Sequence, residues 1–199
     1  MHLVRTHPAM RDAVAIAAEG FARPVTPELE QDVASHLADG QLVYSFVADG
    51  ATAGFVIFDV IGEAGDILYL SGIILRRGYQ RRRNVLAAIQ AAQQALPRVR
   101  YLAYRTQSLR MYTAGMAACE PAYPNRENGP CGSELLRVGQ QAATHLGGVF
   151  PVTRGCYGGP LYGERPQHPD AELSAWWDGL CSFADGDAVI VVGALLPPA

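Results

Sequence analysis

The chain has no lysine: all 16 basic residues are arginine, against 19 acidic residues, which gives a formal net charge of −3. Covalent catalysis by a lysine amine is therefore excluded. The small negative charge also argues against a general nucleic-acid binder. Every fixed positive charge is a planar guanidinium group, whose shape suits carboxylate and phosphate groups.

Cysteine is scarce, and long apolar runs are absent. The four cysteines, at positions 119, 131, 156 and 181, form no C-x-x-C pair and have no closely spaced histidine. We therefore expect free thiols and no metal site. No stretch approaches 18 consecutive apolar residues, and the first residues, MHLVRTHPAM, carry charge and proline where a signal peptide needs an apolar run. These absences predict a cytoplasmic protein with no membrane association.

The first half of the chain predicts two helices and then three strands. Helical spacing of apolar residues covers 8–22, and Thr26-Pro27 starts a second helix over 26–38. Strand-like runs follow at 42–48, 52–61 and 67–75. Because Asp49-Gly50 is a strong hairpin signal, we expect an antiparallel meander.

The second half predicts a strand–helix–strand unit and a mixed α/β sheet. A helix over 85–96 and a strand over 101–106 follow the meander, and a helix is expected over 107–119. Residues 120–128 are turn-forming. Two more helices, over 133–146 and 171–183, precede a last strand over 188–192.

Five of the 16 arginines lie in the segment RRGYQRRRN, at positions 76, 77, 81, 82 and 83, between a predicted strand and a predicted helix. Backbone N–H groups and the positive end of the helix dipole converge at such a turn. The segment therefore suits a pyrophosphate group.

The run ILYLSGIILRRGYQRRRNVLAAIQAA resembles the acyl-CoA-binding segment of the Gcn5-related N-acetyltransferase (GNAT) superfamily, where a loop Q/R-x-x-G-x-G/A opens a helix and holds the CoA pyrophosphate. Gln80 matches the first position. Arg83 and Val85 replace the small residues, so the loop is degenerate. The resemblance implies a co-substrate, acetyl-CoA or another acyl-CoA, bound by Ile73, Ile74, Leu75, Gln80, Arg81, Arg82, Arg83, Asn84, Val85 and Gln107.

The run YLAYRTQSLRMYTAG resembles the strand, turn and helix that carry a tyrosine in the same superfamily. The resemblance implies that Tyr112 protonates the leaving thiolate. Eleven residues before Gln80, where several members carry a catalytic glutamate, this chain has Tyr69. A phenol is a weak base unless its pKa is lowered. The alternatives are a water relay or a carboxylate, either Asp59 or Asp66.

The glycine-rich segment RGCYGGPLYGERP predicts an ordered loop with close backbone approach. Tyr157, Tyr162 and Glu164 are the candidates for binding the acceptor. We expect residues 1–128 to form the GNAT-like core. Residues 129–199 then form a C-terminal extension of the same compact domain, which completes the sheet and the acceptor pocket.

The resulting hypothesis is an acyl-CoA-dependent N-acyltransferase, in the first place an acetyltransferase, with a GNAT-like fold. Its acceptor would be a small amine or an amino-acid-like metabolite that attacks the acyl group directly in a ternary complex. One alternative is another donor on the same fold, either an aminoacyl-tRNA or a carrier-protein thioester. The other is a non-catalytic module that binds CoA or another ligand. A homodimer is compatible with each of these three hypotheses.

Overall fold

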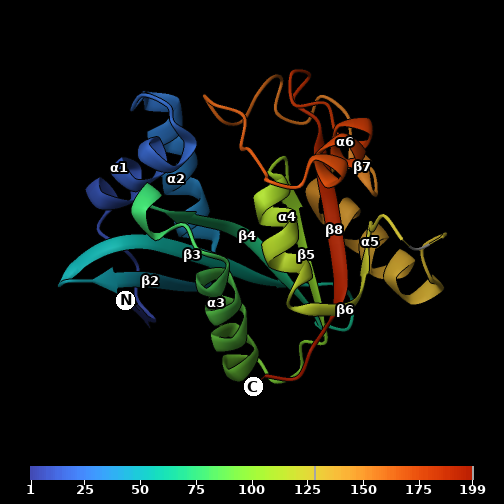
Figure 1. Cartoon of the computed structure of the whole chain (residues 1–199). Helices are drawn as coiled ribbons and strands as arrows, with labels where there is room; N and C mark the ends of the chain where they lie inside the picture. The colour runs from blue at the N-terminus through green and yellow to red at the C-terminus, as the bar shows by residue number, and fades with distance from the viewer. Residues whose placement is uncertain (128, 199) are drawn as a thin grey trace.

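One mixed sheet organises the structure, a computed structural model that describes residues 1–127 and 129–198 (Figure 1). Within these residues its strands follow the order β1-β2-β3-β4-β5-β8-β6, and β7 also pairs with β8. The strands are β1 (His2–Val4), β2 (Leu42–Ala48), β3 (Ala51–Ile61), β4 (Ile67–Leu75), β5 (Tyr101–Thr106), β6 (Cys119–Tyr123), β7 (Val152–Thr153) and β8 (Ala188–Leu195).

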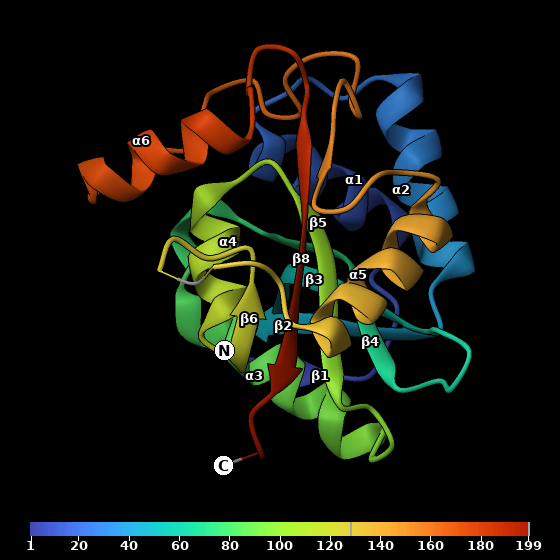
Figure 2. The same ribbon diagram turned by 90° about the vertical axis from the view of Figure 1, so that its right-hand side faces the viewer.

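Helices cover both faces of the sheet (Figures 1 and 2). On one face α1 and α2 pack on β3 and its neighbours, and α5 packs on β5 and β8. The other face carries α3, α4 and α6. The helices are α1 (Met10–Phe21), α2 (Pro27–Asp39), α3 (Arg82–Ala95), α4 (Leu109–Met116), α5 (Ser133–Leu146) and α6 (Ala171–Leu180), with a short 3-10 turn over Arg77–Tyr79.

Local signals placed the two helices and three strands between residues 8 and 75 correctly, to within two residues at each end. The Thr26 hydroxyl accepts a hydrogen bond from the Leu29 N–H at 3.3 Å and so caps α2. Asp49 and Gly50 both have positive φ, which matches the predicted two-residue hairpin turn between β2 and β3. The mixed α/β sheet is therefore confirmed.

Several predicted boundaries were wrong. Helix α3 begins at Arg82 rather than 85, and β6 replaces the predicted turn after α4. Strand β1 was missed, and α6 ends at Leu180, short of the predicted 183. Strand β6 contains Pro121 and lies at the sheet edge, paired with β8. Proline at an edge strand carries no local strand signal, so only tertiary pairing forms this strand.

The last strand is inserted into the sheet instead of being added at its edge. Strand β8 lies antiparallel between β5 and β6. Its residues Val189 to Val192 are almost fully buried. Strand β8, from the second part of the chain, therefore lies between two strands from the first part. The division of the chain into a core over 1–128 and an extension over 129–199 stays a prediction.

Strands β4 and β5 separate half-way along their length. Their parallel pairing runs from Ile67 and Tyr101 to Leu70 and Tyr104 and then stops. Beyond this point β5 continues alongside β8, while β4 stays paired with β3 up to Leu75. Ser71 is an extra residue in the β3–β4 register, a β-bulge at the point of separation. One edge of β4 from Ser71 to Leu75 is therefore unpaired by β5.

All four cysteines are free thiols, as predicted. Among the helices in the described residues, none combines the length and the apolar character needed to cross a membrane.

Candidate functional site

A cavity of about 490 Å³ lies where β4 separates from β5, on the face that carries α1, α2 and α5. Its lining combines three carboxylates, two histidines, an arginine and several tyrosines with the unpaired part of β4. These residues include Asp32, His36, Asp39, Asp59, Tyr69, Ser71, Gly72, Ile73, Ile74, Arg105, His145, Tyr157 and Tyr162.

The strand residues predicted to flank the donor are divided between the two faces of β4. Ile73 and Leu75 pack on the core beneath α3, and Ile74 packs on the core beneath α1 and α2. Ile73 and Ile74 also line the cavity. Because the adjacent edge of β4 has no β5 partner, its backbone groups can pair with the amides of an extended ligand.

The Asp59 carboxylate is held in place at the floor of the cavity. The Gln41 N–H donates to Oδ1 at 3.0 Å, and the Ser71 hydroxyl donates to Oδ2. Asp59 also lies opposite Tyr69 in the β3–β4 register. Asp66, the other candidate base, instead pairs with Arg137 at 3.4 Å. Of the two carboxylates, only Asp59 lines the cavity.

Tyr69 is buried beside Asp59, and its ring meets the His145 ring edge-on with 5.4 Å between centroids. Burial raises the pKa of Tyr69 well above its ordinary value, although the nearby Arg105 opposes the shift. The hydroxyl therefore stays protonated at neutral pH. The burial of the Tyr69 hydroxyl favours a role as hydrogen-bond donor and does not support a role as general base.

Arg105 is a cavity residue that the sequence analysis missed. It lies on β5 directly after Tyr104, the last residue paired with β4. Its guanidinium carbon lies 5.5 Å from the centroid of the Tyr157 ring. An arginine within the otherwise largely apolar strand YLAYRT was the signal that could have identified it.

The predicted acceptor residues do not all reach the cavity. Tyr157 and Tyr162 line it, and burial raises the pKa of both hydroxyls. Glu164 is exposed and approaches Arg77 at 3.9 Å instead. A Cβ on Gly163 would collide with the carbonyl oxygen of Ala22, which confirms the predicted close backbone approach of this loop.

Two of the five clustered arginines anchor the loop after β4. Arg76 Nη1 lies 2.7 Å from Glu19 Oε2, and the Arg77 N–H donates to Glu19 Oε1 at 2.9 Å. Burial acts to raise the pKa of Glu19, but these two bonds outweigh it and lower the pKa. Both arginines therefore hold the loop against α1.

The other arginines stand at the start of α3. Arg81 and Arg83 are exposed, and neither has an acidic partner in the part of the chain that the structure describes. The Arg82 side chain lies outside the described residues. Arg81 is the N-cap residue of α3, and no side chain caps this helix end. The guanidinium groups of Arg81 and Arg83 and the backbone N–H groups of the first turn therefore lie together at the N-terminus of α3.

The side chains of the remaining predicted loop residues make contacts within the chain, and their part in binding the co-substrate stays a prediction. The Gln80 side-chain amide donates to the Leu75 carbonyl oxygen at 3.0 Å, and that of Asn84 donates to the Tyr79 carbonyl oxygen at 2.6 Å. Val85 is buried in the core beneath α3. A valine in place of the expected small residue therefore does not fill the space in front of the helix end.

Tyr112 lies outside the cavity. Its hydroxyl donates to the Pro124 carbonyl oxygen at 2.9 Å, and its ring packs against Trp176 and Trp177 with centroids 5.5 and 5.0 Å away. Burial raises its pKa to about 12. This position supports a packing role, and the role of Tyr112 as proton donor stays a sequence prediction.

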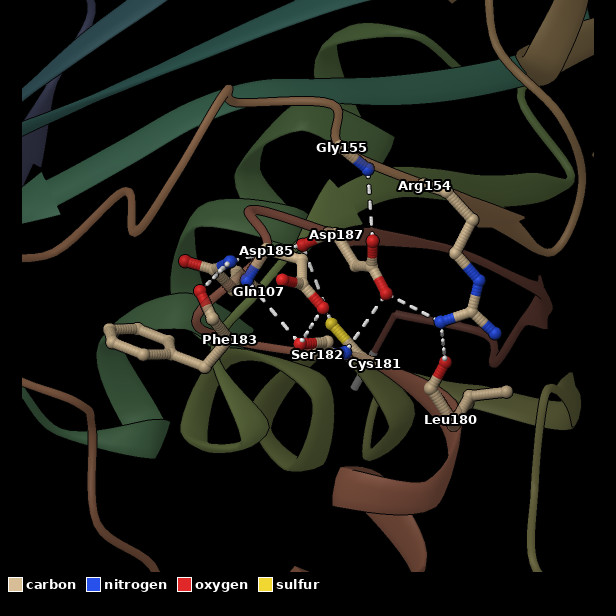
Figure 3. Close-up of polar contacts among 9 residues, drawn as sticks. All are labelled: Gln107, Arg154, Gly155, Leu180, Cys181, Ser182, Phe183, Asp185 and Asp187. Atoms are coloured by element: carbon tan, nitrogen blue, oxygen red, sulfur yellow. Dashed lines mark hydrogen bonds and ion pairs between the residues drawn. The ribbon is translucent and has the colours of Figure 1, made fainter.

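Gln107 ties down the segment 154–187, which we call the closing segment. Its side-chain amide donates to the carbonyl oxygens of Phe183 at 3.1 Å and Asp187 at 3.2 Å (Figure 3). Its oxygen accepts from the Leu161 N–H at 2.9 Å. Both donors and one lone pair of the oxygen are thus engaged within the chain. These bonds give the Gln107 side chain a structural role, and its contact with the co-substrate stays a prediction.

Asp187 is the centre of the closing segment and is 2% exposed. Its carboxylate accepts from Arg154 Nη1 at 2.5 Å, from the Gly155 N–H at 2.9 Å and from the Ser182 N–H at 3.0 Å (Figure 3). Burial alone would raise the pKa of Asp187, but these bonds outweigh it and hold the pKa below its ordinary value. The network fixes the loop that carries Tyr157 and Tyr162.

The fold agrees with those of solved N-acetyltransferases. No protein-family model and no curated protein sequence matches the chain. The ribosomal-protein-S18-alanine N-acetyltransferase from Escherichia coli superposes with a TM-score of 0.56 at 14% identity, covering 100% of this chain and 96% of that one. Aminoglycoside 6′-acetyltransferase type Ii gives 0.53 at 8% identity, covering 100% of both chains.

The chain has the GNAT fold. At identities of 8 and 14%, the similarity establishes the fold and not the substrate. In this GNAT-fold chain no group of three or more His, Cys, Asp or Glu side chains that could hold a metal ion occurs among the described residues.

Proposed function

We propose that the chain is an N-acyltransferase that takes an acyl group, in the first place acetyl, from acyl-CoA and transfers it to the amine of a small metabolite. The observation that carries the proposal is the end of β4–β5 pairing at Leu70 and Tyr104. This separation exposes the edge of β4 to a cavity lined by carboxylates. The same strand leads directly to the arginines at the start of α3.

The donor fits the residues on this side. The unpaired backbone of β4 from Ser71 to Leu75 would hold the pantetheine amides, and Arg81 and Arg83 would bind the pyrophosphate with the first-turn N–H groups of α3. In the family, small residues at this loop let the backbone approach the pyrophosphate closely. Here the charge of the Arg83 side chain would bind the pyrophosphate instead. Acyl-CoA brings the activated acyl group to this edge.

The acceptor fits the opposite side of the cavity. An amine is a cation at neutral pH, so Asp32, Asp39 and Asp59 attract it. Asp59 would take the amine proton through the Ser71 hydroxyl, which already donates to Asp59. A backbone N–H of the open β4 edge would stabilise the oxyanion of the tetrahedral intermediate. The acyl carbon–sulfur bond then breaks, and CoA leaves as a thiolate that accepts a hydrogen bond from the protonated Tyr69 hydroxyl and takes up a proton from solvent.

Calorimetry with CoA and acetyl-CoA tests the donor half. We expect saturable binding of both at concentrations below about 1 mM. A folded protein that binds neither at that concentration would refute the proposal.

Replacement of the proposed base tests the acceptor half. We expect Asp59→Asn to lower kcat at neutral pH by about 100-fold or more, because general-base catalysis contributes about 10²- to 10⁴-fold. Asp39→Asn removes a carboxylate of the same cavity and should act mainly on KM. Equal losses of kcat in both variants would remove Asp59 from the proton path.

A further inference from the structure

Arg105 has no acidic partner, although it is partly buried and charged. None of the seven ion pairs formed by the described residues includes it. It lines the cavity on β5, directly after the point where β4 leaves. A partly desolvated guanidinium without an anion is unfavourable, because burial of a charge costs free energy unless a counter-charge offsets it.

The groups around Arg105 do not supply this counter-charge. Tyr157 presents its ring to the guanidinium at 5.5 Å, and Tyr69 is the second phenol that acts on it electrostatically. Burial raises the pKa of both phenols, so both are neutral at pH 7. The guanidinium is thus oriented by neutral aromatic groups and keeps its positive charge toward the cavity.

The position of Arg105 relative to Asp59 indicates what the cavity binds. Asp59, Tyr69 and Ala103 are direct cross-strand neighbours, and Arg105 lies two residues farther along β5 on the same face as Ala103. Two strand spacings, about 10 Å, thus separate the backbones of β3 and β5 at Asp59 and Ala103, and Arg105 lies about 7 Å farther along β5. Because the arginine side chain is long, its guanidinium group can lie closer to the Asp59 carboxylate than the two backbones do. A negative and a positive side chain therefore stand on either side of Tyr69.

We propose that Arg105 binds a carboxylate of the acceptor, so that the acceptor is an amino acid or a closely related amino-carboxylate, and this rests on the function proposed above. The acceptor's ammonium group faces Asp59 and its carboxylate faces Arg105. A planar guanidinium binds a carboxylate through two parallel hydrogen bonds. Because three carboxylates also line the cavity, a single negative charge on the ligand fits better than a doubly charged phosphate.

Paired probes that differ in this one group test the proposal. The common L-amino acids and their carboxamides keep the same amine and side chain, but the amide is neutral. Binding is measured by ligand-observed NMR in the presence of CoA, and acetylation by release of free CoA from acetyl-CoA. We expect at least one amino acid to bind and react about 10- to 100-fold better than its amide, the range for a lost charge-assisted hydrogen bond.

Three variants assign this preference to Arg105. Arg105→Gln should abolish it by weakening the amino acid and sparing the amide, and Arg105→Lys should retain part of it. Arg100→Gln, an exposed arginine just before the other end of β5, should leave it unchanged. Thermal unfolding of each variant verifies that it is folded.

The outcomes separate this proposal from the proposed function. If CoA binds but amino acids and amides bind alike, or if Arg105→Gln weakens both equally, the carboxylate assignment is overturned and the acyltransferase proposal stands. The assignment is also overturned if CoA binds and no amino acid binds at about 10 mM. If amino acids bind through Arg105 and CoA does not bind, the assignment stands and the acyltransferase proposal fails.

Discussion

The loop over 76–85 and the closing segment over 154–187 are both rich in charged residues, but they use charge in opposite ways. In the loop, Arg81 and Arg83 are exposed at an uncapped helix end and have no acidic partner among the described residues. In the closing segment, Asp187 is buried with three donors on its carboxylate. Burial turns a charge into a structural tie, whereas exposure without a partner leaves it available to a ligand. Five variants test this contrast and the role of Tyr112.

The largest effect should come from Asp187→Ala. The substitution leaves the N–H groups of Gly155 and Ser182 without their acceptor, in hydrogen bonds that are partly buried, and it leaves Arg154 without its buried counter-charge. We therefore expect the free energy of unfolding to fall by about 3 kcal/mol. Urea denaturation measures it. A loss below about 1 kcal/mol would show that the network is not a structural tie.

The same carboxylate predicts a pH dependence of stability. Because its pKa is lowered in the folded state, its contribution is present above about pH 4 and is lost as the pH falls through the folded-state pKa. The difference in unfolding free energy between the wild type and Asp187→Asn should therefore shrink as the pH is lowered from about 7 toward 2. A constant difference would contradict the assignment.

The second effect concerns binding and not stability. Replacing both Arg81 and Arg83 by alanine should weaken CoA binding by about 10- to 100-fold, because charge-assisted hydrogen bonds contribute about 1.5–3 kcal/mol. The free energy of unfolding should not change. Arg98→Ala, an exposed arginine beyond the far end of α3, is the matched control for calorimetry. A loss of stability with unchanged CoA affinity would make these arginines structural.

A third, smaller effect is expected for Tyr112→Phe. The lost hydrogen bond to the Pro124 carbonyl oxygen should lower the free energy of unfolding by about 1 kcal/mol and leave kcat within about twofold. Denaturation and steady-state kinetics measure the two quantities. A large fall in kcat at unchanged stability would instead support the proton-donor role that the family resemblance implies.

The smallest effect should come from Asp178→Ala. Its ion pair with Arg165 also lies in the closing segment, but both side chains are more than 40% exposed. Exposed pairs contribute about 0–1 kcal/mol, so the change in unfolding free energy should stay below about 1 kcal/mol. A loss as large as that of Asp187→Ala would mean that burial is not what separates the two carboxylates.

Several features of the fold could be predicted because their signals are local. The Thr26 hydroxyl meets an N–H group three residues away, and Asp49-Gly50 forms its turn without help from the rest of the chain. The β4 strand and the arginine-rich turn were recognised for the same reason. Strand β6 was missed because its only reason to be extended is pairing with β8, about 70 residues later.

The site was predicted in part. Asp59, Tyr69, Tyr157 and Tyr162 were selected from the sequence and line one cavity. Gln107 was assigned to the co-substrate because its position in a turn matched a motif. Its actual partners lie up to 80 residues away, so no local pattern could reveal that its hydrogen bonds were already taken. Arg105 was overlooked because an arginine in a strand has no meaning until its surroundings are known.

The sequence by itself determined that every positive charge is a guanidinium, that five of these cluster after one strand, and that the elements follow a GNAT-like order. Such features depend on composition and on contacts a few residues apart. Only the tertiary structure decided which charges are free. Glu19 pairs with the Arg76 guanidinium, and that of Arg77 approaches Glu164. Arg81 and Arg83 stay exposed, and the separation of β4 from β5 leaves Arg105 facing the cavity without an acid. Whether a charge binds a ligand depends on the counter-charges that folding brings to it from distant parts of the chain.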